Sequence, residues 1–132
     1  MSAQRRLQIL KDADASRAAL EATQYSLAAG FDDTRSRMIA TAVSELARNI
    51  LKYASAGEIR LRHVDGPSGR GVEIEAVDRG PGMEDIEAAM GDHFSSGGTL
   101  GLGLPGVRRM MDEFSLDSTP GEGTRVTAVK WL

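Results

Sequence analysis

The spacing of apolar residues predicts helices that pack against a sheet. The clearest helical period covers residues 32–54, where apolar side chains three or four positions apart form one stripe. The members of this stripe are Ile39, Val43, Leu46, Ile50 and Tyr53. Asp32 or Asp33 can cap the start of this helix, and Gly57 follows its end. An alanine-rich segment at residues 14–29, ended by Gly30, predicts another helix nearer the start of the chain.

Shorter segments in which apolar and polar residues alternate predict five strands. They lie around residues 7–9 and at residues 58–64, 72–76, 114–118 and 124–131. Turn residues at 65–69 and around Pro120 and Gly121 join two pairs of strands into hairpins. Two more helices are expected at residues 84–90 and 102–113, the latter with Leu104, Val107, Met110 and Met111 on its inner face. These elements predict an α/β (α+β) two-layer sandwich, with helices on one face of a mixed, largely antiparallel sheet.

Composition narrows the class of protein. The chain has 132 residues, of which 41% are hydrophobic, so we expect one globular domain over residues 1–132. Its 16 basic and 19 acidic residues give a formal net charge of −3, which argues against a protein that binds nucleic acid by neutralising phosphates. The absence of cysteine excludes disulfides, thiolate metal sites and cysteine nucleophiles. With no signal peptide and no apolar run of about 18 residues, we expect a soluble cytoplasmic protein without a membrane partner.

Two glycine clusters indicate the candidate chemistry. Residues 78–82 read Asp-Arg-Gly-Pro-Gly after an expected strand, and residues 101–106 read Gly-Leu-Gly-Leu-Pro-Gly at the start of an expected helix. Glycine lets the backbone approach a bulky ligand, and a glycine-rich turn entering a helix presents N–H groups to phosphates. A carboxylate such as that of Asp78 can accept a hydrogen bond from a purine amino group. Together the clusters predict a nucleotide pocket, although either cluster alone could be only a turn.

Two common nucleotide motifs do not account for this pattern. The chain contains no G-x-x-x-x-G-K-[ST] P-loop. Gly101, Gly103 and Gly106 do fit the dinucleotide pattern G-x-G-x-x-G, but residues 93–99 before them read as a loop and not as the required strand. Only 26 residues follow Gly106, and they contain no convincing second crossover, so we reject a dinucleotide site.

A third group of candidate residues lies on the helix expected at residues 32–54. Glu45 and Asn49 are four residues apart, so both project from the same side at the margin of the apolar stripe. A carboxylate and a carboxamide placed there can serve as a general base and a Mg²⁺ ligand. Lys52 follows within a further turn. The same residues could also form an ordinary helix flank, with Glu45 solvated and Asn49 paired to a neighbour.

The order of these motifs resembles that of the GHKL family, whose ATP site is the Bergerat fold. Residues 45–49 (Glu-Leu-Ala-Arg-Asn), 78–82, 101–103 and 121–124 (Gly-Glu-Gly-Thr) stand in the order of the family's N, G1, G2 and G3 boxes. Within the family the chain is most similar to the small bacterial anti-sigma regulatory kinases, and in particular to the switch kinases of the stressosome. The resemblance extends over almost the whole chain.

The resemblance implies phosphoryl transfer from ATP to a serine or threonine of a partner protein, with ADP as the nucleotide product. It implies that Asn49 holds Mg²⁺ and that Glu45 accepts the proton of the incoming hydroxyl or orients that hydroxyl. Asp78 would bind the adenine amino group, supported by Thr124. The other nucleotide contacts that it implies are Gly80 and Gly82 near the base, and Gly101, Leu102, Gly103, Leu104 and Gly106 around the phosphates, with Lys52 as a further candidate.

The segment between the glycine clusters corresponds to the ATP lid of this family. Residues 91–100 contain three glycines, two serines and one threonine, so their ordering entropy is high, and Phe94 is expected to pin the lid. His93 and His63 are interpreted as surface residues. Neither is expected to be a phosphoacceptor, because the chain lacks the phosphoacceptor helical hairpin of a sensor histidine kinase.

The resemblance also implies the partners. These are STAS-domain proteins, as stressosome scaffold and antagonist, and a PP2C-type phosphatase or its regulatory domain, which the released kinase would bind and activate. Two alternatives remain open: an anti-sigma factor that sequesters a sigma factor and phosphorylates a STAS antagonist, and a non-catalytic module whose nucleotide only sets partner affinity. Residues 104–107 and the C-terminal Lys-Trp-Leu favour the switch kinase.

Overall fold

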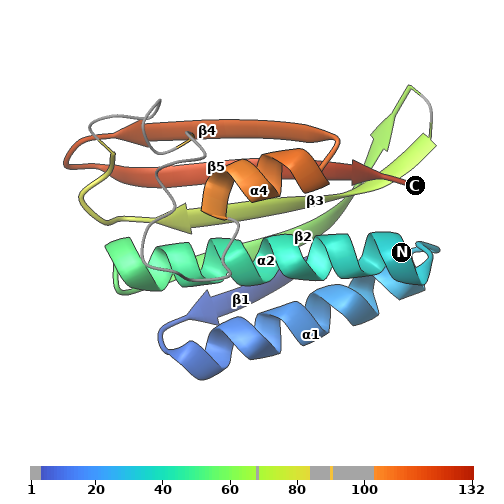
Figure 1. Ribbon diagram of the computed structural model, residues 1–132, viewed down its shortest axis with the longest axis horizontal. Helices are drawn as coiled ribbons and strands as arrows, with labels where there is room; N and C mark the ends of the chain where they lie inside the picture. Colours follow the sequence, from blue (N-terminus) through green and yellow to red (C-terminus); the bar gives the residue numbers. More distant parts are fainter. Residues whose placement is uncertain (1–3, 68, 84–89, 91–102) are drawn as a thin grey trace.

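The computed structural model describes residues 4–67, 69–83, 90 and 103–132, which form two layers. One layer is a five-stranded sheet, and the helices of the other cover one of its faces (Figure 1). The strands are β1 (Arg5–Ile9), β2 (Gly57–Gly66), β3 (Gly69–Asp78), β4 (Glu113–Thr119) and β5 (Gly123–Trp131). The helices are α1 (Asp12–Ala28), α2 (Asp33–Tyr53) and α4 (Gly103–Met110). The predicted two-layer α/β fold is therefore confirmed.

The strands lie in the order β1-β2-β3-β5-β4, and every neighbouring pair is antiparallel. The parallel pairing that a mixed sheet would contain is thus absent from the described strands. Hairpins join β2 to β3 and β4 to β5, and the α1–α2 pair returns the chain so that β2 runs against β1. Because β5 lies between β3 and β4, the end of the chain occupies the interior of the sheet, beside the strand that carries Asp78.

Helix α2 supplies the centre of the core. The side chains of Ile39, Val43, Leu46 and Ile50 are at most 2% exposed, as the apolar stripe predicts. The prediction for the fifth member is wrong, because Tyr53 is 48% exposed. Tyr53 is the last residue of α2, and its ring remains at the surface, with the Lys52 ammonium 5.2 Å from the ring centroid.

Helix α4 is shorter than the predicted segment of residues 102–113. The Met111 N–H still donates to the Val107 carbonyl at 3.1 Å, but the Asp112 N–H donates to the Val129 carbonyl of β5 at 2.9 Å. The helix therefore ends at Met110, where the sheet takes over the backbone hydrogen bonding. The predicted inner face is confirmed, since Leu104, Val107 and Met111 are buried and Met110 is partly buried against the core.

His63 is more enclosed than predicted. It lies on the face of β2 that is turned toward the helices, in phase with Ile59 and Leu61. Its ring stacks on that of Tyr25 of α1, with the centroids 4.6 Å apart. Burial raises the pKa of the Tyr25 hydroxyl. The stack thus joins α1 to β2.

Some predictions fall outside the described residues. They are the helix at residues 84–90, of which the structure describes Met90 alone, and the lid at residues 91–100, which includes His93 and Phe94. None of the described helices combines the length and hydrophobicity that a membrane span requires.

Candidate nucleotide site

The carboxylate of Asp78 stands at the end of β3, where the chain leaves the sheet. Asp78 is opposite Gly57 of β2 on one side and Thr124 of β5 on the other, and it is partly buried. Its Oδ1 accepts a hydrogen bond from the Gly80 N–H at 2.9 Å. This bond closes the turn that follows β3 and fixes the side chain. An ionised carboxylate has two acceptor oxygens, and no hydrogen bond from the described residues reaches Oδ2, which is therefore available to a ligand.

Glycines allow the backbone segments around Asp78 to pack tightly. A Cβ at Gly82, whose φ is +75°, would lie 2.2 Å from the Thr119 carbonyl oxygen of β4. A Cβ at Gly123, whose φ is +110°, would lie 2.2 Å from the carbonyl oxygen of Asp78 itself. Gly82 and Gly123 thus bring the turn after β3 against the β4–β5 hairpin. At Gly80 the space is also taken by the protein, because a Cβ would lie 2.6 Å from the Cβ of Ala54.

A hydroxyl network joins this turn to Thr124. The Ser118 Oγ accepts a hydrogen bond from the Met83 N–H at 2.8 Å and lies 2.8 Å from the Thr124 Oγ1 and 3.2 Å from the Gly123 carbonyl oxygen. A serine hydroxyl has one proton and two acceptor sites. All three contacts are satisfied when Ser118 donates to Gly123 and Thr124 donates to Ser118. The Thr124 oxygen is then left as an acceptor beside Asp78.

Ser118 was not among the residues that the sequence identified. It belongs to no glycine box, and the sequence marks it only as a polar residue in an alternating strand. The structure shows that this alternation places it on the same face of the sheet as Phe114 and Leu116, next to the buried Thr124.

Glu45 of α2 contacts the first residue of α4. The Gly103 N–H donates to Glu45 Oε2 at 3.2 Å, across 58 positions of sequence. Gly103 has a φ of +62°, a left-handed conformation that favours glycine. A carboxylate beside the first N–H of a helix is also favoured by the helix dipole. This contact joins two groups of residues that the sequence had identified separately, the N-box helix and the second glycine cluster.

The other residues predicted for the site differ in how far they are exposed to a ligand. Asn49 lies one turn after Glu45 and is partly buried, whereas Lys52 is exposed at the end of α2. The Leu104 side chain is 5% exposed and belongs to the core, and Gly106 is buried within α4, so a ligand could reach only backbone atoms there. Gly101 and Leu102 lie outside the described residues.

The site offers few protein ligands for a metal. No group of three or more histidine, cysteine or acidic side chains gathers at one point within the described part of the chain. The carboxamide of Asn49 is a hard oxygen ligand that suits Mg²⁺, which commonly keeps several waters and binds substrate phosphates. The residues therefore fit a cation that arrives with a polyphosphate and takes one ligand from the protein.

Comparisons with known proteins identify the family. A family model described as "Histidine kinase-like ATPase domain" matches residues 10–130. The chain belongs to this family. The predicted GHKL membership is thus confirmed, and an ATPase domain implies a site for ATP.

Curated relatives narrow the class of enzyme. The chain is 52% identical over 103 residues to the serine/threonine-protein kinase RsbT of Bacillus subtilis, covering 78% of this chain and 77% of the relative. It is 36% identical over 98 residues to an anti-sigma F factor of a Thermoanaerobacter species, covering 71% of this chain and 68% of the relative. These similarities confirm the predicted class, a protein serine/threonine kinase of the partner-switching type.

Solved structures share the fold at low sequence identity. The RsbU and RsbW domains of a Mycobacterium tuberculosis protein match 99% of this chain with a TM-score of 0.67 and 19% identity, and the chain spans 33% of that longer one. A SiaB-SiaC complex from Pseudomonas aeruginosa matches 96% of this chain and 89% of its own with a TM-score of 0.60 and 14% identity. At such identities the likeness concerns the fold alone.

Proposed function

We propose that this protein is the switch kinase of a bacterial stress-response pathway, which transfers the γ-phosphoryl group of ATP to a serine or threonine of a STAS-domain protein. The observation that carries the proposal is the contact between Glu45 and the Gly103 N–H at 3.2 Å. It holds a carboxylate, one turn from the carboxamide of Asn49, at the start of α4, the helix that begins within the second glycine cluster. The similarity to RsbT over most of both chains supports the same function.

Adenine recognition is assigned to Asp78 and Thr124, which are opposite each other in neighbouring strands. The adenine amino group is a hydrogen-bond donor, so it requires acceptors. Asp78 retains the lone pairs of Oδ2, and the Ser118 network leaves the Thr124 oxygen as an acceptor. Two acceptors side by side favour an amino-bearing purine over one that carries a carbonyl at the same position.

Phosphate binding is assigned to the start of α4 and to α2. Backbone N–H groups at Gly101, Leu102, Leu104 and Gly106 would bind the phosphates, while Gly103, whose N–H donates to Glu45, would let the backbone lie close to them. Asn49 would hold Mg²⁺, which neutralises phosphate charge when it is bound. Lys52, whose ammonium lies 5.2 Å from the Tyr53 ring centroid, is a further candidate for a phosphate contact. Gly80 and Gly82 would keep the turn after β3 close to the base.

Glu45 is assigned to the acceptor hydroxyl. In the transfer, the hydroxyl oxygen of the partner's serine or threonine forms a bond to the γ-phosphorus while the bond from that phosphorus to the β-bridging oxygen breaks and ADP leaves. The hydroxyl proton goes to Glu45. The Gly103 N–H occupies Oε2, which leaves the other oxygen of the carboxylate to orient the hydroxyl and accept the proton.

The partners are proposed from the relatives. STAS-domain proteins of the stressosome are the proposed substrates, and a PP2C-type phosphatase or its regulatory domain is the proposed target of the released kinase, both in the cytoplasm. The alternative, a kinase that also sequesters a sigma factor, rests on the 36% identity to an anti-sigma F factor. The 52% identity to RsbT makes the switch kinase the stronger candidate.

A transfer and capture experiment distinguishes these functions. The purified protein is incubated with [γ-³²P]ATP, Mg²⁺ and each STAS-domain protein encoded by its source genome, and the native protein is also used to capture partners with and without ADP. We expect label on a STAS protein and capture of STAS proteins without a sigma factor. A captured sigma factor would establish the anti-sigma alternative, and absence of transfer to every captured partner would establish the non-catalytic module.

A further inference from the structure

The edge of the sheet at β1 has backbone groups available for pairing. Among the described strands β1 has one neighbour, β2, so the opposite edge of Arg5–Ile9 carries N–H and C=O groups that the sheet leaves unpaired. Such an edge is a template for an added strand. This edge lies on the α1 side of the molecule, whereas the contacts of the nucleotide site are made by α2, α4, β3, β4 and β5.

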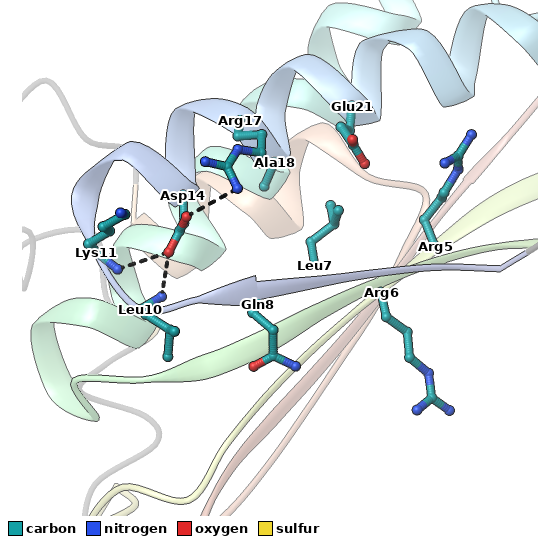
Figure 2. Close-up of a pocket in the computed structure, with 10 residues that line it drawn as sticks. All are labelled: Arg5, Arg6, Leu7, Gln8, Leu10, Lys11, Asp14, Arg17, Ala18 and Glu21. Atoms are coloured by element: carbon teal, nitrogen blue, oxygen red, sulfur yellow. Dashed lines mark hydrogen bonds and ion pairs between the residues drawn. The ribbon is translucent and has the colours of Figure 1, made fainter.

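A groove of about 590 Å³ runs between β1 and α1 (Figure 2). Figure 2 shows Leu7 projecting from β1 toward the helix, while Arg6 and Gln8 project to the other side of the strand. Leu7 and Ala18 give the groove an apolar floor, and Leu10 at its end is 62% exposed. A strand added to β1 would therefore bring alternate side chains onto apolar surface.

The rim of the groove is basic. Its charged lining consists of Arg5, Arg6, Lys11, Arg17, Asp14 and Glu21, a formal charge of +2 on a chain whose net charge is −3. The acid Asp14 is already engaged, because its Oδ2 accepts hydrogen bonds from the N–H groups of Leu10 and Lys11 at 2.9 and 3.1 Å. It is also 7% exposed. Its Oδ1 lies 3.6 Å from Nη1 of Arg17 in an ion pair, so the charge of +2 is carried by Arg5, Arg6 and Lys11, partly offset by Glu21.

We propose that this groove binds an extended acidic segment of a partner protein, which pairs with the free edge of β1 as a sixth strand. The backbone of the segment supplies hydrogen bonds to β1, and its sequence follows from the two sides of the strand. Side chains turned toward α1 are apolar where they meet Leu7 and Ala18, and side chains turned away are acidic beside Arg6. This proposal is independent of the function assigned to the nucleotide site.

Charge argues against a second copy of this chain as the occupant. Antiparallel pairing of the whole of β1 with itself would set Arg5 opposite Ile9 and Arg6 opposite Gln8, so it would double the positive charge at this edge and give neither arginine an acidic partner. An acidic strand in the same position has the opposite effect, and it also raises the association rate at low ionic strength.

The direct test uses fluorescein-labelled peptides in which valine and glutamate alternate, titrated with the full-length protein and followed by anisotropy. We expect saturable binding that weakens in about 0.5 M NaCl, where the Debye length is only a few Å. A peptide alternating valine and lysine should bind at least about 10-fold more weakly. The valine–glutamate peptide carrying N-methyl groups on alternate residues should also lose binding, because it has lost donors that pair with an edge.

Matched variants locate the site on the protein. The double variant Arg5→Glu, Arg6→Glu should bind the acidic peptide at least about 5-fold more weakly, since each lost or reversed surface pair contributes a modest amount. The control Arg35→Glu, Arg37→Glu makes the same charge change at exposed positions of α2 and should bind as the wild type does. ADP binding should be unchanged in both, which shows that the fold is intact.

Three results would overturn the proposal. Equal binding of the N-methylated and unmodified peptides would mean that charge alone attracts the peptide. Equal losses in the two double variants would place the binding elsewhere. Sedimentation showing a dimer that Arg5→Glu, Arg6→Glu dissociates, without saturable peptide binding, would make a second copy the occupant.

Discussion

Replacement of Asp78 by Asn tests the adenine site with little disturbance of the fold. Asn retains a carbonyl oxygen that can accept the Gly80 N–H in place of Oδ1, so the turn after β3 keeps its 2.9 Å hydrogen bond. The amide nitrogen then replaces Oδ2 and presents a donor where the adenine amino group also presents a donor. The variant therefore removes one charge-assisted hydrogen bond to the ligand and little else.

The magnitude follows from that single bond. A hydrogen bond to a charged group contributes about 1.5–3 kcal/mol, which corresponds to a loss of roughly 10- to 150-fold in affinity. We expect Asp78→Asn to weaken ADP binding by this factor in isothermal titration calorimetry, while its thermal midpoint without nucleotide stays close to that of the wild type.

A matched control uses the same chemical change at Asp65, which is exposed in β2 near the tip of the β2–β3 hairpin. Asp65→Asn should bind ADP as the wild type does. Unchanged ADP affinity in Asp78→Asn, with the fold intact, would refute the assignment of Asp78 to adenine.

Three further predictions concern the metal, the hydroxyl network and acid stability. Asn49→Ala should abolish the tightening of ATP binding by Mg²⁺ and should affect metal-free ATP binding less. Calorimetry in Mg²⁺ and in EDTA measures this difference, and a tightening equal to that of the wild type would exclude Asn49 as a metal ligand. Ser118→Ala removes the hydrogen-bond partner of the Met83 N–H and of the Thr124 hydroxyl, so it should lower the unfolding free energy by about 1–3 kcal/mol and weaken ADP binding. The control Ser115→Ala, on the exposed face of β4, should change neither quantity. The hydrogen bond from the Leu10 N–H lowers the pKa of the Asp14 carboxyl, helped by the Lys11 N–H and by Arg17. The ionised carboxylate therefore stabilises the fold above the unfolded pKa of 3.8, and this stabilisation is lost as the pH falls through the lower folded pKa. Urea unfolding should therefore show Asp14→Asn as destabilising at pH 7, with a difference from the wild type that shrinks as the pH is lowered below 3.8, and a difference that does not change with pH would contradict this origin.

The sequence predicted those parts of the molecule that local patterns determine. The core stripe of α2 follows from apolar spacing. Asp78 and Glu45 could be proposed as site residues because their glycine and carboxamide neighbours stand at fixed short distances along the chain. The alternation of apolar residues also located all five strands.

The parts that were missed depend on contacts between distant segments. Ser118 matters because the β4–β5 register brings it to Thr124 and because the turn after β3 donates to it, and neither follows from a local pattern. Tyr53 fits the helical period but falls where α2 ends, so periodicity alone overestimated its burial. His63 is partly buried because α1 places Tyr25 against it. The sheet was expected to be mixed because strand order cannot be read from strand positions.

The contact between Glu45 and Gly103 has the same origin. The sequence placed each residue in a nucleotide site, but the hydrogen bond between them spans 58 positions and depends on the packing of α4 against α2. This contact is what brings the proposed base to the end of α4 that is proposed to bind the phosphates.

The most direct test of the central claim is the single-turnover rate of phosphoryl transfer by Glu45→Gln to a STAS-domain acceptor, at matched occupancy of ATP and acceptor. Gln keeps an oxygen that can accept the Gly103 N–H, so α4 should stay in place, and Glu122→Gln in the exposed β4–β5 turn serves as the control. A positioned general base contributes about 10²–10⁴-fold, and a loose transition state that needs little early deprotonation favours the lower end of that range. The account predicts a loss of about 100-fold or more with ATP and partner binding retained. A transfer rate in Glu45→Gln equal to that of Glu122→Gln would contradict it.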